Sequence, residues 1–194
     1  MAAGKIIILN GTSSSGKTSI VKALQTALDE PYLDAGLDRF LWMLPARYLE
    51  RPLWDDVLGM ASQAGNIGHQ LVAGMHRSIL ALSRSGINVV ADHVLVDPRW
   101  LDECIDLFEG LPAYLVGIHC PLEVLEQREA SRKDRTLGQA REQFGLVHKH
   151  GLYDIEVDTS ISKPEECAQQ IMQRMKDPPI ALRGLRRTAQ THAS

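Results

Sequence analysis

The stretch "LNGTSSSGKTS", Leu9 to Ser19, places three serines between two glycines, and its flanks decide the fold. It follows "KIIIL", an apolar run typical of a buried strand, and it precedes "IVKALQTALDE", which has helical periodicity. The stretch matches G-x-x-x-x-G-K-[ST] at Gly11, Gly16, Lys17 and Thr18. Between a strand and a helix, this pattern predicts a P-loop that binds a nucleotide, rather than a structural glycine turn.

The composition of the loop suits a phosphate ligand. Glycine and serine let successive backbone N–H groups turn inward around phosphate oxygens, an approach that larger side chains would block. The helix that begins near Gly16 adds the positive end of its dipole. We expect Lys17 to reach the β- and γ-phosphates and the Thr18 hydroxyl to coordinate Mg²⁺. The predicted nucleotide contacts are Gly11, Thr12, Ser13, Ser14, Ser15, Gly16, Lys17, Thr18 and Ser19.

Apolar runs alternate with helical patterns along the chain. The runs are continuous in Val, Ile and Leu, as expected for strands that are covered on both faces. Alternating strands and helices predict an α/β fold with a parallel sheet in three layers. The predicted strands are Ile6–Leu9, Tyr32–Leu33, Ile87–Ala91, Ala113–His119 and Asp154–Val157.

The chain of 194 residues has the length of one domain, predicted over 1–176. After Lys176 the composition changes, and three arginines occur in a stretch of little periodicity. We therefore expect 177–194 to be a frayed, flexible tail, with a specific binding arm as the alternative.

The composition also excludes several classes of protein. A net charge of −3 provides no general attraction to nucleic acid or to an anionic membrane. No apolar run approaches the length of a transmembrane helix, and "MAAGKIIIL" is too short for a secretory signal. The three cysteines form no C-x-x-C pair, which indicates buried free thiols. We therefore expect a cytoplasmic protein that binds neither nucleic acid nor membrane.

A P-loop serves kinases, GTP switches and motors. The sequence contains no N-K-x-D motif for guanine, and it is short for an ATPase machine. A small-molecule kinase needs cations over the transferred phosphate. Arg128, Arg132 and Arg135 in "HCPLEVLEQREASRKDR" are spaced by four and three, which predicts one face of a lid helix. The alternative is a solvated basic helix end paired with Glu126 and Glu129.

A small-molecule kinase also needs a base near the acceptor hydroxyl, and three aspartates follow predicted strands. The carboxyl ends of parallel strands converge on the ligand crevice. Asp34 and Asp38 follow the second strand, and we expect Asp38 to be the base, with an N-cap of the next helix as the alternative. Asp92 ends the third strand, as a Walker-B acid that holds Mg²⁺ would, with a cap near Pro98 as the alternative. The side chain of His93 should point to the opposite face of the sheet from Asp92, because successive residues of a strand alternate.

Two segments are expected to complete the site. The lid should span about 121–145. An insertion at about 39–68 contains Trp42 and Trp54 and no clear strand, and it is predicted to form a wall over the acceptor. Its alternative is an irregular cap that covers the sheet edge.

These residues resemble the chloramphenicol 3-O-phosphotransferases and their relatives over about Ile6 to Met175. The matching pieces, in order, are "IILNGTSSSGK", "GLDRFLWMLP", "VVADHVL", "YLVGIHC", "REASRKDR" and "VHKHGLYDIEVDTS", with "ECA" after them. The resemblance implies a five-stranded parallel P-loop kinase sheet and transfer of the ATP γ-phosphate to an antibiotic hydroxyl. It also implies that Asp38 is the base, Arg135 the phosphate-binding arginine and Lys17 the P-loop lysine.

The chain departs from the family pattern where the acceptor should bind. His93 stands where the family has a second acid, and the region from Arg39 to Gly68 differs in length. A second hypothesis is therefore a metabolic kinase of the shikimate or gluconate type, which would bind an acceptor carboxylate through arginines. The available ones are Arg39, Arg47, Arg51, Arg77 and Arg84. A third hypothesis is a nucleotide-binding regulator without turnover.

Overall fold

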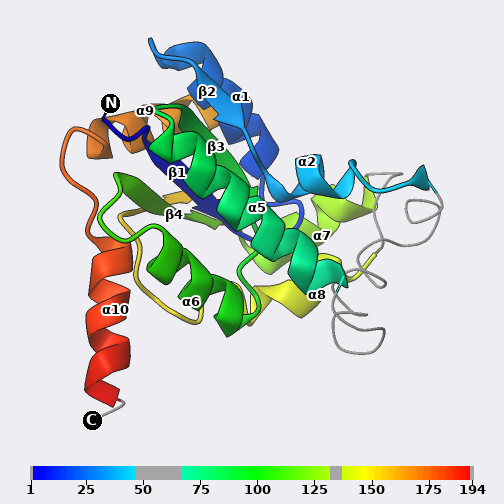
Figure 1. The fold of residues 1–194 in the computed structure, drawn as a ribbon. Coiled ribbons are helices and arrows are strands. Elements are labelled where there is room, and N and C mark those ends of the chain that lie inside the picture. The colour runs from blue at the N-terminus through cyan, green and yellow to red at the C-terminus, as the bar shows by residue number, and fades with distance from the viewer. Residues whose placement is uncertain (1, 47–66, 132–136, 193–194) are drawn as a thin grey trace.

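The computed structural model describes residues 2–46, 67–131 and 137–192. Within these ranges, five strands form one sheet in the order β2-β3-β1-β4-β5, and every pairing is parallel (Figure 1). This confirms the predicted α/β fold and its five-stranded sheet. The strands are β1 Ile6–Asn10, β2 Tyr32–Asp34, β3 Asn88–His93, β4 Ala113–His119 and β5 Ile155–Asp158.

Strand β1 lies at the centre of the sheet because its residues are apolar on both faces. It pairs with β3 from Ile6↔Val89 to Asn10↔His93, and it pairs with β4 on its other side. All five of its residues are buried. The register brings the ends of β1 and β3 level, so the loops that follow both strands begin at the same edge of the sheet.

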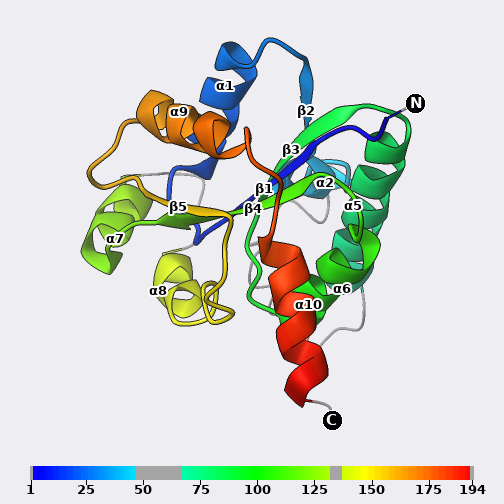
Figure 2. The ribbon, with the colours of Figure 1, turned by 90° about the vertical axis from the view of Figure 1, so that its left-hand side faces the viewer.

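Helices cover both faces of the sheet, which gives three layers (Figure 2). Alternate residues of a strand point to opposite faces. Ile7 and Leu9 pack with α1 (Lys17–Ala27) and α9 (Pro164–Arg174). Ile6 and Ile8 belong to the core of the other face, which is covered by α5 Ile67–Arg84, α6 Pro98–Leu107 and α10 Ala181–His192.

Three shorter helices lie near the carboxyl ends of the strands (Figure 1). They are α2 Leu37–Leu41, α7 Leu122–Ala130 and α8 Gln139–Phe144. The buried carboxylate of Glu129 in α7 accepts hydrogen bonds from the backbone N–H groups of Gly138 and Ala140, at 2.7 and 3.0 Å. It thereby satisfies donors at the start of α8 and ties the two helices together.

The expected frayed tail is wrong for 181–192, which form helix α10. Ala181 and Leu182 are buried against the sheet, and Arg186 pairs with Asp106 of α6 at 2.7 Å. The buried carboxylate of Asp154 accepts a hydrogen bond from the Ile180 N–H at 2.7 Å, just before the helix starts. The helix forms because its apolar residues have helical spacing and pack on the core. Its arginines do not oppose this packing, since they lie on the exposed face or pair with acids.

The cysteines agree with the expectation from the sequence. Cys104, Cys120 and Cys167 are free and buried. Burial raises the pKa of each thiol, so each thiol stays protonated. None of the helices in the described ranges is long and apolar enough to span a membrane.

Candidate active site

The P-loop runs from the end of β1 to the start of α1 and curls around its own backbone. Gly16 precedes the helix with φ 90°, and Ser14 has φ 61°, so both occupy the left-handed region. The hydroxyls of Ser13, Ser14 and Ser15 are buried, and none has a hydrogen-bond partner within the part of the chain that the structure describes. Buried donors of this kind suit a ligand rich in oxygen atoms, as a phosphate is.

Lys17 places its cation inside this loop. Its Nζ donates to the carbonyl oxygens of Gly11 and Thr12, at 2.9 and 2.6 Å, and the residue is 8% exposed. A buried ammonium requires such partners. The two carbonyls therefore hold the charge beside the loop's N–H groups, where an anion would lie.

Asp92 faces the start of α1 from the end of β3. Its Oδ2 accepts a hydrogen bond from the Thr18 hydroxyl at 3.3 Å. Burial raises the pKa of Asp92, and the nearby charge of Lys17 opposes that rise. The alternative role as a cap near Pro98 is wrong, because Asp97 caps α6 by accepting from the Arg99 N–H at 2.9 Å.

The oxygens of Thr18 and Asp92 fit a hard divalent cation. Mg²⁺ is bound through one or two protein oxygens, with phosphates and waters completing the shell. One hydroxyl and one carboxylate lie side by side at the mouth of the P-loop. The donor set therefore agrees with the expected Mg²⁺, and these two residues would hold it.

Asp38 lies in the first turn of α2 and lines the same cavity as Lys17 and Asp92. The N-cap of α2 is Gly36, which leaves the predicted capping role without support. Asp34 is engaged elsewhere, because its Oδ2 pairs with the Arg39 guanidinium at 2.7 Å. Asp34 is the last residue of β2, and of these two aspartates Asp38 is the one that lines the cavity.

Gly36 is required by the approach of α2 to β3. A Cβ at this position would collide with Oδ1 of Asp92. The backbone just before α2 therefore lies directly against the Asp92 carboxylate. This contact places α2, which carries Asp38, directly beside the end of β3, which carries Asp92.

The cavity has a volume of about 340 Å³ and is open to solvent along one side. It extends from α2 across the P-loop to the loop between β5 and α9. Its lining beyond the P-loop consists of Leu37, Asp38, Asp92, His93, Val94, Arg128, Ser131, Thr159, Ser162 and Pro164. The P-loop thus forms its floor, and residues from α2 and α7 form opposite ends.

Arg128 is the lid arginine that falls within the described residues. It donates from NH1 to the Thr159 hydroxyl at 3.0 Å and from NH2 to the Thr159 carbonyl at 2.7 Å. Arg132 and Arg135 lie outside the described residues, so their shared helical face stays a prediction. Glu126 pairs with Arg141 at 2.7 Å, and its expected pairing with Arg132 or Arg135 lies outside the described residues.

Sequence reasoning did not assign a role to the groups that hold the P-loop from behind. The Ser13 N–H donates to Gln143 Oε1 of α8 at 2.6 Å. Asn10, at the end of β1, donates to the Val147 carbonyl at 2.8 Å and accepts from the Leu95 N–H at 2.8 Å. An Asn that ends a buried apolar strand was the available signal, because buried amides require partners.

Beside Asn10, Tyr153 joins β1 to the segment before β5. Its hydroxyl accepts from the Asn10 amide at 2.7 Å and lies 2.6 Å from Nδ1 of His148. The hydroxyl thus joins the Asn10 amide to the His148 ring. Burial, then the nearby His119 and His150, lower the pKa of His148 to about 4.

The expected acceptor wall is described only at its edges. Trp42 and Met43, at the end of α2, are 67% and 69% exposed. Trp54, Arg47 and Arg51 lie outside the described residues. Trp42 follows Asp38 by four residues, and its backbone N–H bonds to the Asp38 carbonyl at 3.0 Å, so the two side chains share one helical face.

Comparison with known proteins shows the family of this chain. Residues 4–176 match the model of the chloramphenicol phosphotransferase-like proteins. A Mycobacterium tuberculosis protein provisionally named as an O-phosphotransferase, found in strains CDC 1551 and H37Rv, is 35% identical over 184 residues, which cover 88% of this chain and 82% of that protein.

Solved structures share the fold at low identity. A sugar kinase from Janibacter sp. HTCC2649 has a TM-score of 0.63 at 16% identity, over 89% of this chain and 95% of that chain. The APS kinase CysC of Mycobacterium tuberculosis, solved with AMPPNP and APS, has a TM-score of 0.62 at 15% identity, over 91% of this chain and all of that chain. On the family match and the 35% identity, the chain belongs to the chloramphenicol phosphotransferase-like family.

Proposed function

We propose that the protein transfers the γ-phosphate of ATP to a hydroxyl group of a small molecule. The observation that carries this proposal is that Lys17, Asp92 and Asp38 line one cavity, with the P-loop as its floor. The family match and the kinase neighbours support the same class of reaction. In this proposal the cavity holds the triphosphate over the P-loop and the acceptor hydroxyl beside α2.

The floor of the cavity, which the P-loop forms, is assigned to the phosphates of the nucleotide. Its backbone N–H groups and the three serine hydroxyls face the phosphates, and Lys17 neutralises the oxygens around the transferred group. Arg128 and Pro164 line the end of the cavity that lies away from α2. A flat guanidinium and a proline ring at this end suit the base of the nucleotide.

Asp38 is assigned to the acceptor hydroxyl. Its carboxylate orients the hydroxyl oxygen toward phosphorus and takes the proton as the new O–P bond forms. The bond between the γ-phosphorus and the bridging oxygen breaks, and that electron pair leaves with ADP. Mg²⁺, held by Thr18 and Asp92 when bound, would neutralise charge on the phosphates.

The acceptor is proposed to be chloramphenicol or another hydroxylated antibiotic. Its support is the exposed Trp42, which offers an apolar ring on the face of α2 that carries Asp38. The metabolic alternative needs arginines for a carboxylate, but two described candidates are engaged: Arg39 pairs with Asp34 and Arg77 pairs with Glu103, at 2.7 and 2.9 Å. Neither lines the cavity.

The experiment is a transfer assay with γ-labelled ATP across hydroxylated antibiotics and small anionic alcohols, with the Lys17→Ala protein as the blank. Label on an uncharged antibiotic supports the proposal as stated. Label only on an anionic alcohol supports the metabolic kinase instead. Tight ATP binding without acceptor-dependent release of ADP, across the whole panel, would contradict transfer and favour a regulator.

A further inference from the structure

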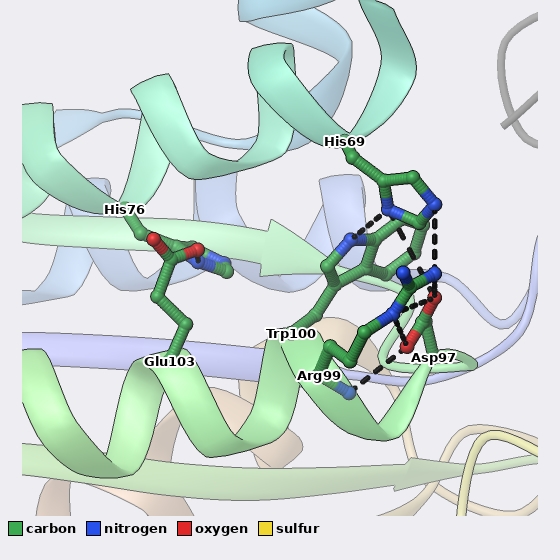
Figure 3. Close-up of polar contacts among 6 residues, drawn as sticks. All are labelled: His69, His76, Asp97, Arg99, Trp100 and Glu103. Carbon is green, nitrogen blue, oxygen red and sulfur yellow. Dashed lines mark hydrogen bonds and ion pairs between the residues drawn. The ribbon is translucent and has the colours of Figure 1, made fainter. Parts of the chain in front are cut away.

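Three side chains from three elements form a buried chain of hydrogen bonds beside the P-loop. Glu103 of α6 and His76 of α5 face one another (Figure 3), and the Glu103 carboxylate lies 2.9 Å from Nδ1 of His76. Nε2 of His76 lies 2.8 Å from Nε2 of His93 at the end of β3. The two histidines are 0% and 1% exposed, so the chain passes through the core between the two helices and the sheet.

The direction of every bond in this chain is fixed by one backbone group. The Val94 N–H can only donate, and it lies 2.7 Å from Nδ1 of His93, so Nδ1 accepts. A neutral His93 then carries its proton on Nε2, and this N–H donates a hydrogen bond to Nε2 of His76. His76 therefore carries its own proton on Nδ1 and donates it to the Glu103 carboxylate. Burial lowers the pKa of both imidazoles, in agreement with two neutral rings.

The same direction excludes a metal site at these histidines. A metal on Nε2 of His93 would require the proton on Nδ1, where the Val94 N–H already points. The neighbouring Cys104 thiol also lies within hydrogen-bond distance of Nε2 of His76, at 3.5 Å, and burial raises its pKa, so it stays a neutral thiol and not a metal-binding thiolate. Across the described ranges, no group of three His, Cys, Asp or Glu residues is arranged to hold a metal ion.

His93, at the inner end of the chain of hydrogen bonds, is joined to the P-loop through its own peptide group. The carbonyl of His93 accepts a long hydrogen bond, 3.3 Å, from the N–H of Gly11, the first glycine of the P-loop. The next residue, Val94, lines the cavity. The imidazole of His93 thus holds one side of the peptide whose other side contacts the P-loop.

We infer that His76 is a positioning residue for nucleotide binding: it fixes the proton and the orientation of His93, and through the His93–Val94 peptide it fixes Gly11. The role rests on the proposed function, since it acts on the P-loop. A fully satisfied polar network specifies one arrangement, and removal of one member leaves a buried donor unpaired. The effect of such a loss should therefore reach the loop as well as the core.

The test compares three variants of the full chain by the affinity for Mg²⁺·AMPPNP, measured by calorimetry. His76→Leu leaves the Nε2–H of His93 unpaired and should weaken binding on the order of tenfold. His76→Gln offers an acceptor oxygen and should recover most of that loss. Glu103→Gln keeps an acceptor for His76 at the rim of the core, so it should bind within about twofold of the wild type. If His76→Leu fails to fold, the imidazole ¹⁵N spectra of the wild type still test the chain of bonds.

His69→Leu is the matched control. His69 also lies on α5 and accepts from the Trp100 indole of α6 at 3.0 Å, two turns from His76 (Figure 3). Its loss should lower stability and leave the affinity unchanged. If His76→Leu and His69→Leu both lose stability while the affinity of both stays at the wild-type value, His76 serves packing alone and the inference is overturned.

Imidazole ¹⁵N spectra of the wild type provide a readout that does not depend on activity. We expect opposite neutral tautomers, with the proton on Nδ1 of one buried histidine and on Nε2 of the other. Two identical tautomers would overturn the chain of bonds. A wild type that binds no nucleotide would overturn the proposed function and this role together, whereas wild-type binding that His76→Leu leaves intact would overturn this role alone.

Discussion

The two walls of the cavity differ in how firmly they are held. The nucleotide wall is buried and bonded from behind: Lys17 is fixed by two carbonyls, and Ser13 by Gln143. The acceptor wall offers Asp38 on a five-residue helix that ends in the exposed Trp42 and Met43. From this difference we expect the first wall to bind one ligand and the second to decide which acceptor binds.

Replacement of Lys17 by Ala should have the largest effect, because it removes the cation of the nucleotide wall. We expect transfer to fall on the order of a thousandfold or more, since the charge that Lys17 neutralises grows in the transition state. Circular dichroism and the melting temperature should show that the fold persists. Turnover near the wild-type rate would contradict the P-loop assignment.

Asp38→Asn separates the two walls. The variant cannot take the proton of the acceptor, and we expect turnover to fall on the order of a hundredfold to ten-thousandfold. Nucleotide affinity should stay unchanged because Asp38 lies on the acceptor wall, and stability should stay unchanged because Gly36 provides the N-cap of α2. Steady-state kinetics measure the turnover, and calorimetry measures the affinity for ATP. Asp92 would inherit the role of base if the variant turned over normally.

Arg128→Ala should affect the nucleotide wall alone. It removes two bonds to Thr159 and one flat side chain from the nucleotide end of the cavity. We expect nucleotide affinity to weaken about tenfold, the cost of about one bond to a charged group. Acceptor binding should not change, and a loss confined to turnover would instead place Arg128 over the transferred phosphate.

Trp42→Ala should act only on the acceptor wall. Because the side chain is 67% exposed, its loss should change the free energy of unfolding by less than about 0.5 kcal/mol. We expect the KM for an aromatic acceptor to rise several-fold, with ATP affinity unchanged. Trp42→Phe is the control and should retain most of the affinity. An unchanged KM in both variants would remove Trp42 from the acceptor site.

The smallest expected effect concerns the back of the nucleotide wall. The pKa of His148 is lowered from its ordinary value to about 4, so the unfolded chain binds a proton there at higher pH than the folded chain does. Stability should therefore fall as the pH drops from about 6.5 to 4. Melting curves against pH should be flatter over this window in His148→Gln, which can still accept from Tyr153; equal slopes would contradict the assignment.

The sequence predicted one wall better than the other for a physical reason. Phosphate recognition uses backbone groups, so it demands glycine and serine at fixed spacing, and such a pattern is visible in one chain. Strands β1, β3 and β4 could be predicted because their apolar runs are continuous. In the proposed site, acceptor recognition would use side chains, for which no spacing rule applies.

Two features were missed because their partners are distant in sequence. Nothing near His76 indicates that it bonds to His93, 17 residues later, because the contact depends on how α5 packs on β3. The helix α10 was missed because its arginines suggested a solvated tail, although Ala181, Leu182 and Leu185 have helical spacing. The His76–His93 contact and helix α10 both depend on packing between distant segments, which the local sequence pattern indicates only weakly.

The contact of Gly36 with Asp92 has a consequence for how this protein can diversify. Since no side chain fits at position 36, substitutions there would drive the two carboxylates of the site apart, and selection should hold that glycine constant. Substitutions at the exposed Trp42 and Met43 carry no such penalty. If the proposed roles hold, we expect changes at the exposed end of α2 to alter the acceptor while the contact between α2 and Asp92 is inherited intact.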